Sequence, residues 1–250
     1  MFSPHITHEE IELLPYVAFG GKITVVDKPE KVAAAAVRLM QEKILGYDTE
    51  ARPSFARGVH YGTSLVQLST ADHAFLFRVD KIGIPKELAA LLQCKDVLKV
   101  GVAIGEDIRG MQRIGAFKPQ GFVDLQVLAD RYGIADKALK KIAAIVLNLR
   151  ISKSQQTSNW AALRYTAEQK LYAATDAWVC REIYLKLMEC QPLPLPQPPA
   201  AKAAEKEADG SAKKKAHKKR HKRRRKPSMM RKAQQPAAAL ITVNPHDSHK

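Results

Sequence analysis

Apolar residues recur along the first 190 residues with two periods, one typical of strands and one typical of helices. Short runs rich in β-branched and aromatic residues predict strands at 22–27, 44–51, 63–71, 73–80 and 97–104. Longer segments with apolar residues three and four positions apart predict helices at 29–43, 85–94, 105–115, 137–149 and 166–190. The segment 121–133 is expected to run from a strand end into a helix.

The order of these elements predicts the fold class. Three strands in succession, followed by alternating helices and strands, indicate a mixed α/β sheet with an antiparallel edge, flanked by helices. The segment 70–73 between two apolar runs is typical of a hairpin turn. We therefore expect the first strands to pair antiparallel.

The composition changes sharply after Cys190. Five prolines in the ten residues 191–200 predict an extended linker, and the segment 213–226, KKKAHKKRHKRRRK, follows it. This part of the chain has too little apolar surface to offset the entropy of folding, so we expect it to be disordered. The expected organisation is an N-terminal extension at 1–21, a folded domain at 22–190 and a Pro-rich linker with a Lys/Arg-rich tail at 191–250.

Most of the formal net charge of +16 belongs to that tail. Residues 191–250 contain 16 Lys and Arg and 4 Asp and Glu, which leaves 25 basic and 21 acidic residues in 1–190. A flexible basic segment suits sequence-independent attraction to nucleic-acid phosphates, and a purely solubilising tail is the alternative. The candidate contacts are Lys213, Lys214, Lys215, Arg220, Arg223, Arg224 and Arg225.

Several protein classes are disfavoured. The three cysteines show no C-x-x-C spacing, so neither a disulfide framework nor a zinc site is expected. The N-terminus lacks the pattern of a secretory signal, and no apolar run approaches the ~18 residues of a membrane span. The expectation is an intracellular protein without membrane partners, cytoplasmic in a bacterial host and, because of the basic tail, nuclear in a eukaryotic one.

Asp48 and Glu50 lie two positions apart within the strand predicted at 44–51. Side chains at i and i+2 of a strand point to the same face, so the two carboxylates project together. Such a pair is costly away from water unless solvent, basic side chains or divalent cations neutralise it. Carboxylate oxygens suit Mg²⁺ and Mn²⁺. A solvated strand end is the alternative interpretation.

Two further acids lie on predicted helices. Asp107 follows an apolar strand at the start of a helix, a place where open α/β sheets commonly assemble sites, although an acid that stabilises the helix N-terminus is the alternative. Tyr172 and Asp176 are four positions apart and share one helix face. The neighbours of Asp176 are small or apolar: Ala173, Ala174, Ala177, Val179 and Cys180. We therefore expect a buried acid that needs a partner, on a helix that approaches the sheet closely.

These motifs, in this order, resemble those of the DEDDy group of 3′–5′ exonucleases. Within this group the chain resembles ribonuclease D and the exonuclease domain of the Werner syndrome helicase. The segments that carry the resemblance are GYDTEARPSF, SLVQLST, KVGVAIGEDIRGM, VDLQVLA, ISKSQQTSNW and LYAATDA. The resemblance covers roughly residues 22–188.

The resemblance implies an RNase H-like exonuclease fold and two divalent cations, Mg²⁺ or Mn²⁺. Its metal ligands correspond to Asp48, Glu50, Asp107 and Asp176, and these acids together with Tyr172 correspond to its catalytic residues. By analogy, Asp48 bridges both ions, Glu50 and Asp176 bind the ion on the nucleophile side, and Asp107 serves the other. Tyr172 would orient the attacking water. The implied activity is hydrolysis from the 3′ end of DNA or RNA, with release of nucleoside 5′-monophosphates.

Three other residues are candidates for substrate contacts or for packing near the site. Phe55 is placed to stack on or wedge the terminal base, with core packing as the alternative. Lys153 is a candidate phosphate contact, with a solvated loop lysine as the alternative. Trp160 is expected to pack and to anchor its loop.

The leading hypothesis is a metal-dependent exonuclease, with DNA and RNA both as candidate substrates. The alternative is a non-catalytic nucleic-acid-binding module on the same fold. A structural protein associated with ribosomes or chromatin is a third hypothesis that rests on the tail alone. All five signature positions are occupied, which favours the enzyme.

Overall fold

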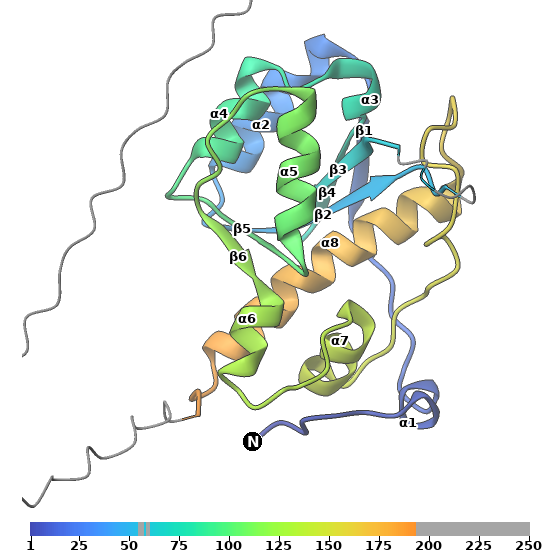
Figure 1. Ribbon diagram of the computed structural model, residues 1–250, viewed down its shortest axis with the longest axis vertical. Helices are drawn as coiled ribbons and strands as arrows, with labels where there is room; N and C mark the ends of the chain where they lie inside the picture. The colour runs from blue at the N-terminus through green and yellow to red at the C-terminus, as the bar shows by residue number, and fades with distance from the viewer. Residues whose placement is uncertain (55–57, 59–60, 194–250) are drawn as a thin grey trace, which may run out of the picture. The chain divides into compact units, whose positions relative to one another are not determined.

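A six-stranded sheet forms the centre of the computed structural model, which describes residues 1–54, 58 and 61–193 (Figure 1). The strands lie in the order β1-β4-β3-β2-β5-β6. Their bounds are β1 (Lys22–Val26), β2 (Ile44–Ala51), β3 (Thr63–Ser69), β4 (His73–Phe77), β5 (Leu98–Gly101) and β6 (Phe122–Asp124). Phe55 and the basic tail residues lie outside the described residues, so their predicted roles stay predictions.

The sheet is mixed, as predicted, and the predicted antiparallel pairing of the early strands is confirmed for β2, β3 and β4, but these pairs do not form the edge of the sheet. β3 is antiparallel to both of its neighbours, β2 and β4, whereas β1 with β4, β2 with β5 and β5 with β6 pair in parallel. The antiparallel strand is interior because the β3–β4 hairpin is inserted between β1 and β2. Both edge strands therefore pair in parallel.

Helices connect the strands and cover both faces of the sheet. They are α1 (His8–Glu12), α2 (Val32–Met40), α3 (Val79–Ile82), α4 (Lys86–Gln93), α5 (Ile104–Ile114), α6 (Leu125–Asp130), α7 (Leu139–Leu147) and α8 (Ala167–Met188), with a 3₁₀ turn, η1, at Pro29–Lys31. The apolar pattern missed α1 and α3 because these helices have only five and four residues, too few for an apolar period to repeat. None of the helices in the described ranges has the length and apolar character needed to cross a membrane.

The two faces of the sheet bury different sets of helices. One face packs Tyr47, Val66 and Phe77 against the helices α2, α4 and α5. The other face is covered by α8, which crosses from β1 to β5 and is drawn as the long orange helix of Figure 1. Asp48 and Glu50 alternate with Tyr47 along β2 and therefore face α8.

Gly46 allows α8 to lie directly on β2. A Cβ atom at Gly46 would lie 1.7 Å from the backbone oxygen of Ala177. The predicted close approach of helix and sheet is therefore confirmed. It brings the α8 residues that precede Ala177 next to the acidic pair on β2.

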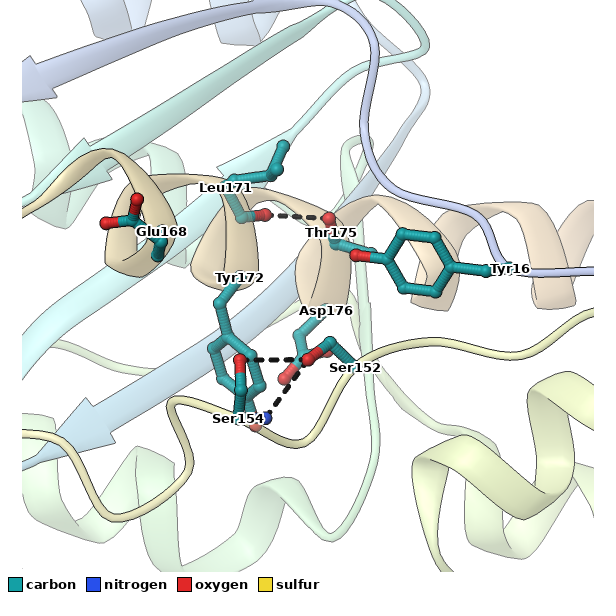
Figure 2. A pocket seen from close by; sticks show the side chains of 8 residues that line it. All are labelled: Tyr16, Ser152, Ser154, Glu168, Leu171, Tyr172, Thr175 and Asp176. Carbon is teal, nitrogen blue, oxygen red and sulfur yellow. Dashed lines mark hydrogen bonds between the residues drawn. The ribbon is translucent and has the colours of Figure 1, made fainter. Parts of the chain in front are cut away.

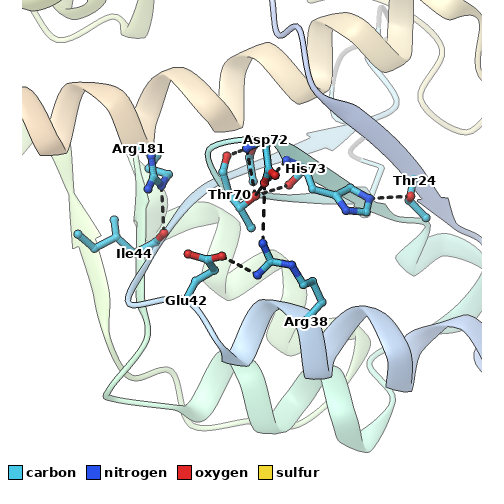
Figure 3. Close-up of polar contacts among 9 residues, drawn as sticks. Thr24, Arg38, Glu42, Ile44, Thr70, Asp72, His73 and Arg181 are labelled. Carbon is cyan, nitrogen blue, oxygen red and sulfur yellow. Dashed lines mark hydrogen bonds and ion pairs between the residues drawn. The ribbon is translucent and has the colours of Figure 1, made fainter.

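The opposite end of β2 and β3 is held by a network of polar contacts (Figure 3). The predicted hairpin turn is confirmed, since Thr70 N donates to His73 O (3.0 Å) and His73 N donates to Thr70 Oγ1 (3.0 Å). Arg38 of α2 pairs with Glu42 (2.6 Å) and with Asp72 of the turn (3.8 Å). These contacts tie α2 to the β3–β4 hairpin.

Candidate metal and nucleic-acid site

Three carboxylates from two elements meet between β2 and α8. One oxygen from each of Asp48, Glu50 and Asp176 lies within 4.8 Å of the others. Asp48 and Glu50 are half-buried, and Asp176 is 6% exposed. The predictions that Asp48 and Glu50 share one strand face and that Asp176 faces the core are confirmed.

Burial raises the pKa of all three groups, and repulsion by neighbouring carboxylates raises it further for Asp48 and Glu50. Burial is the largest cause for Asp48, followed by the charges of Asp176 and Asp107. Burial and the Asp48 charge raise the pKa of Glu50 to about 10. Burial raises the pKa of Asp176 to about 7. Each ionised carboxylate therefore costs free energy at neutral pH unless a cation compensates it.

No arginine or lysine within the described ranges forms an ion pair with this cluster. The acids can be neutralised by solvent, by basic side chains or by divalent cations. Within the described part of the chain, basic side chains do not neutralise them. The donor set consists of hard carboxylate oxygens, which suits Mg²⁺ or Mn²⁺. The residues present therefore fit a divalent cation.

Asp107 approaches the cluster from α5 but is not one of the three grouped acids. It lies in the first turn of α5, as predicted, and its Oδ1 accepts a hydrogen bond from Thr49 Oγ1 (2.7 Å). Its charge contributes to the raised pKa values of Asp48 and Glu50. Burial raises the pKa of Asp107 itself. The structure thus brings three of the four predicted ligands together and places the fourth beside them.

Asp124 is a positioning residue that was not among the residues predicted from the sequence. Its carboxylate accepts hydrogen bonds from the backbone N–H groups of Ala103 (3.1 Å), Ile104 (3.2 Å) and Gln126 (2.9 Å). Ala103 has a left-handed backbone conformation with φ of 57°. Asp124 therefore holds the turn from which α5 carries Asp107. An aspartate directly before the apolar helix LQVLAD was the available signal.

Tyr172 lies one helical turn before Asp176, on the same side of α8. Burial, and next the Asp176 charge, raise the pKa of its phenol, so the hydroxyl stays protonated at neutral pH. Trp160 is fully buried against Tyr172, with ring centroids 6.1 Å apart, which confirms its predicted packing role. Trp160 thereby fixes the position of the Tyr172 ring.

Two pockets share Ser152, Tyr172 and Asp176 in their linings. The first has a volume of about 120 Å³ and is shown in Figure 2; its lining also includes Ser154 and Tyr16. The second, of about 310 Å³, is lined by Lys153 together with Lys137 and Lys140. The structure therefore places Lys153 in a basic pocket that extends to the acid cluster.

The mixed sheet with its acid cluster beneath α8 is the RNase H-like exonuclease fold. Ribonuclease D of Escherichia coli has this fold, with a TM-score of 0.61 at 24% identity over 67% of this chain and 44% of that one. Ribonuclease D of Trypanosoma brucei in complex with RNA U12 also shares it, with a TM-score of 0.61 at 21% identity over 69% of this chain and 64% of that one.

The chain belongs to the DEDDy-type 3′–5′ exonuclease family. The family model described as "3'-5' exonuclease" matches residues 23–190. The bifunctional 3′–5′ exonuclease/ATP-dependent helicase WRN of Mus musculus is 30% identical over 184 residues, which cover 70% of this chain. The chain spans only 13% of the length of that relative.

Proposed function

We propose that this protein is a metal-dependent 3′–5′ exonuclease that removes nucleoside 5′-monophosphates from the 3′ end of DNA or RNA. The observation that supports this most is the cluster of Asp48, Glu50 and Asp176. These acids share one small volume, have raised pKa values and lack basic partners among the described residues, in a chain of the 3′–5′ exonuclease family. Such a cluster suits a site that binds cations.

In this proposal Asp48, Glu50 and Asp176 hold two divalent cations, Mg²⁺ or Mn²⁺, with Asp107 as a further ligand. When bound, the cations stabilise the attacking and leaving oxygens of an in-line displacement at phosphorus. The carboxylates would supply the oxygen ligands of these cations. Asp124 keeps Asp107 in place through the turn before α5.

Tyr172 is proposed to position the attacking water. Its raised pKa makes the phenol a poor base, but its O–H remains available to donate a hydrogen bond. Lys153 is proposed to contact a substrate phosphate, since it lines the basic pocket beside Asp176. Phe55 and the basic tail, which lie outside the described residues, are proposed to contact the nucleic acid.

The decisive experiment uses a single-stranded oligonucleotide labelled at its 5′ end, with Mg²⁺ or Mn²⁺. A ladder that shortens from the 3′ end is expected, with nucleoside 5′-monophosphates as products. Asp48→Asn and Asp176→Asn should each lower the rate by more than about 100-fold, because loss of outer-shell partners of metal ligands alone costs 10–100-fold. Matched DNA and RNA strands compare the two substrate classes.

Binding of the oligonucleotide without cleavage under either metal would identify a non-catalytic nucleic-acid-binding module instead. Release of the 5′ label as a mononucleotide from the first time points, without a ladder, would contradict the proposed polarity. For location, the proposal is the cytoplasm in a bacterial host and the nucleus in a eukaryotic one.

A further inference from the structure

We infer that Tyr16 forms a stacking subsite for a nucleobase of the substrate strand, next to the acid cluster. The inference rests on the proposed function, because it names how that site recognises its substrate. Tyr16 lies in the segment before β1, outside the residues 23–190 that the family model matches. The family match therefore does not cover it.

Tyr16 belongs to the same pocket as two residues of the acid site. The pocket of about 120 Å³ is lined by Tyr16, Tyr172 and Asp176, together with Ser152, Ser154, Glu168, Leu171 and Thr175. Figure 2 shows the Tyr16 ring extending from the N-terminal segment toward Thr175, with Tyr172 and Asp176 on the adjoining turn of α8. The Tyr16 residue is 53% exposed. A large aromatic surface therefore faces solvent at the entrance to the site.

The backbone around Tyr16 is held in place by several contacts. Tyr16 forms a parallel bridge with Arg150, in which Val17 N donates to Arg150 O (3.0 Å) and Arg150 N donates to Pro15 O (2.9 Å). Farther along, Phe19 N donates to the buried Thr175 Oγ1 of α8 (3.0 Å). The ring is thus presented by a fixed segment, which reduces the entropy lost when a ligand stacks on it.

The charge of the pocket favours a neutral base over a phosphate. Glu168 and Asp176 are acidic, and the residues that line this pocket include neither lysine nor arginine. The guanidinium of Arg150 lies over the Tyr16 ring, 5.6 Å from its centroid, but it pairs with Glu12 (3.7 Å), so an acid already matches its charge. Lysines gather instead in the second pocket, of about 310 Å³. A strand whose scissile phosphate lies at the acid cluster would therefore direct its neighbouring phosphates toward Lys153 and a base toward Tyr16.

The size of the pocket and the chemistry of its walls agree with this occupant. At about 120 Å³ it is smaller than the roughly 300 Å³ and above of pockets that enclose a whole drug-sized ligand, so it accommodates part of a ligand. The hydroxyl of Ser154, which accepts a hydrogen bond from Ser152 Oγ (2.9 Å), can donate its own hydrogen to a base edge or a sugar. Stacking on an aromatic ring tolerates any base, which suits an exonuclease that degrades strands of any sequence.

The inference is tested with Tyr16→Ala and Tyr16→Phe, and with Leu13→Ala as a matched control. Leu13 is 86% exposed on the same segment and does not line the pocket. The dissociation constant of a fluorescent single-stranded oligonucleotide is measured by anisotropy in EDTA, where hydrolysis does not interfere. Tyr16→Ala should raise it about 5- to 140-fold, the equivalent of 1–3 kcal/mol per stacked base. Tyr16→Phe and Leu13→Ala should stay within about 2-fold of the wild type.

A second arm of the experiment identifies the base. Two further oligonucleotides carry an abasic residue, one at the 3′-terminal position and one at the second position. With one of these two, wild type and Tyr16→Ala should have equal dissociation constants, because the base that stacks on Tyr16 is then missing. Equal dissociation constants for wild type and Tyr16→Ala, or no oligonucleotide binding by the wild type, would overturn the inference. So would an abasic substitution without effect at both positions.

Hydrolysis assays on the same wild-type and Tyr16→Ala proteins distinguish a failure of this inference from a failure of the proposed function. If the wild type hydrolyses the strand in Mn²⁺ but binds it no more tightly than Tyr16→Ala does, the stacking subsite is refuted and the exonuclease proposal stands. A loss of affinity in Tyr16→Ala, with no hydrolysis by the wild type under either metal, supports the subsite and refutes the exonuclease.

Discussion

At the scale of single residues, the site is defined by carboxylates that repel one another. Asp48, Glu50 and Asp176 have raised pKa values because they are buried together. A carboxyl group whose pKa is raised in the folded state holds its proton there at pH values where the unfolded chain has released it. Its contribution to stability is complete below the unfolded pKa near 4 and is lost as the pH rises through the folded pKa.

The first prediction concerns the pH dependence of the metal-free protein. In EDTA, the free energy of unfolding should fall from pH 5 to pH 9, through about 7 for Asp176 and toward 10 for Glu50. The asparagine of Asp176→Asn cannot ionise. This variant should therefore lose less free energy of unfolding over the same pH range, by a few kcal/mol, because each pKa unit corresponds to 1.36 kcal/mol. Urea unfolding at each pH measures both. Parallel curves for the two proteins would contradict the origin of the raised pKa values.

Gln67 is an unusual neighbour of this cluster. It is opposite Asp48 in the β2–β3 register, is fully buried, and neither polar atom of its side chain has a hydrogen-bond partner among the described residues. Removing an unpaired buried amide relieves a desolvation penalty of about 1–3 kcal/mol. Gln67→Met should therefore be neutral or more stable by up to that amount in urea unfolding. A loss of more than about 2 kcal/mol would show that the amide is paired in solution.

At the scale of elements, the site depends on how closely α8 lies on β2. Gly46 and Ala177 make that approach possible, and any side chain at Gly46 would collide with a backbone oxygen. Asp124 plays a comparable part for α5, since it binds the two N–H groups at the turn that precedes this helix. Each acid is thus positioned by a contact between elements.

Gly46→Ala tests the contact between α8 and β2. The added Cβ, 1.7 Å from Ala177 O, should cost about 3 kcal/mol or more in urea unfolding and should weaken binding of Mn²⁺, because α8 must move away from β2. Gly20→Ala is the matched control, since a Cβ there meets nothing within 4 Å. If both variants unfolded alike, the proposed dependence of the site on this close packing would be refuted.

Local patterns were enough to predict the elements that carry the site. The strand at 44–51 and the helix face with Tyr172 and Asp176 follow from periodicities within one segment. The pairing of Asp48 with Gln67, the role of Asp124 and the position of Tyr16 could not be predicted, because each depends on which distant segment lies alongside. The interior position of β3 was missed for the same reason: strand order is not a local property.

At the scale of the whole molecule, charge is divided between a nearly balanced body and a basic tail. The body contains the acid cluster, and the tail, outside the described residues, has 12 net positive charges. We expect the body to perform the chemistry and the tail to add affinity that falls steeply with salt.

Deletion of residues 191–250 tests this division. Cleavage of short oligonucleotides should remain within about 2-fold of the full chain, because the described site lies entirely before residue 191. Binding to long strands should weaken, and the slope of log K against log salt should become shallower. An unchanged slope would refute a role of the tail in binding phosphates.

The measurement that tests the central claim most directly is the melting temperature with and without metal. At pH 8, Mn²⁺ at 100 times its dissociation constant should stabilise the wild type by about 2.7 kcal/mol, or roughly 5 to 11 °C over EDTA. Asp48→Asn in EDTA should melt no lower than the wild type and should respond much less to Mn²⁺. A wild-type melting temperature that is the same in Mn²⁺, in Mg²⁺ and in EDTA would contradict the claim that these acids form a metal site.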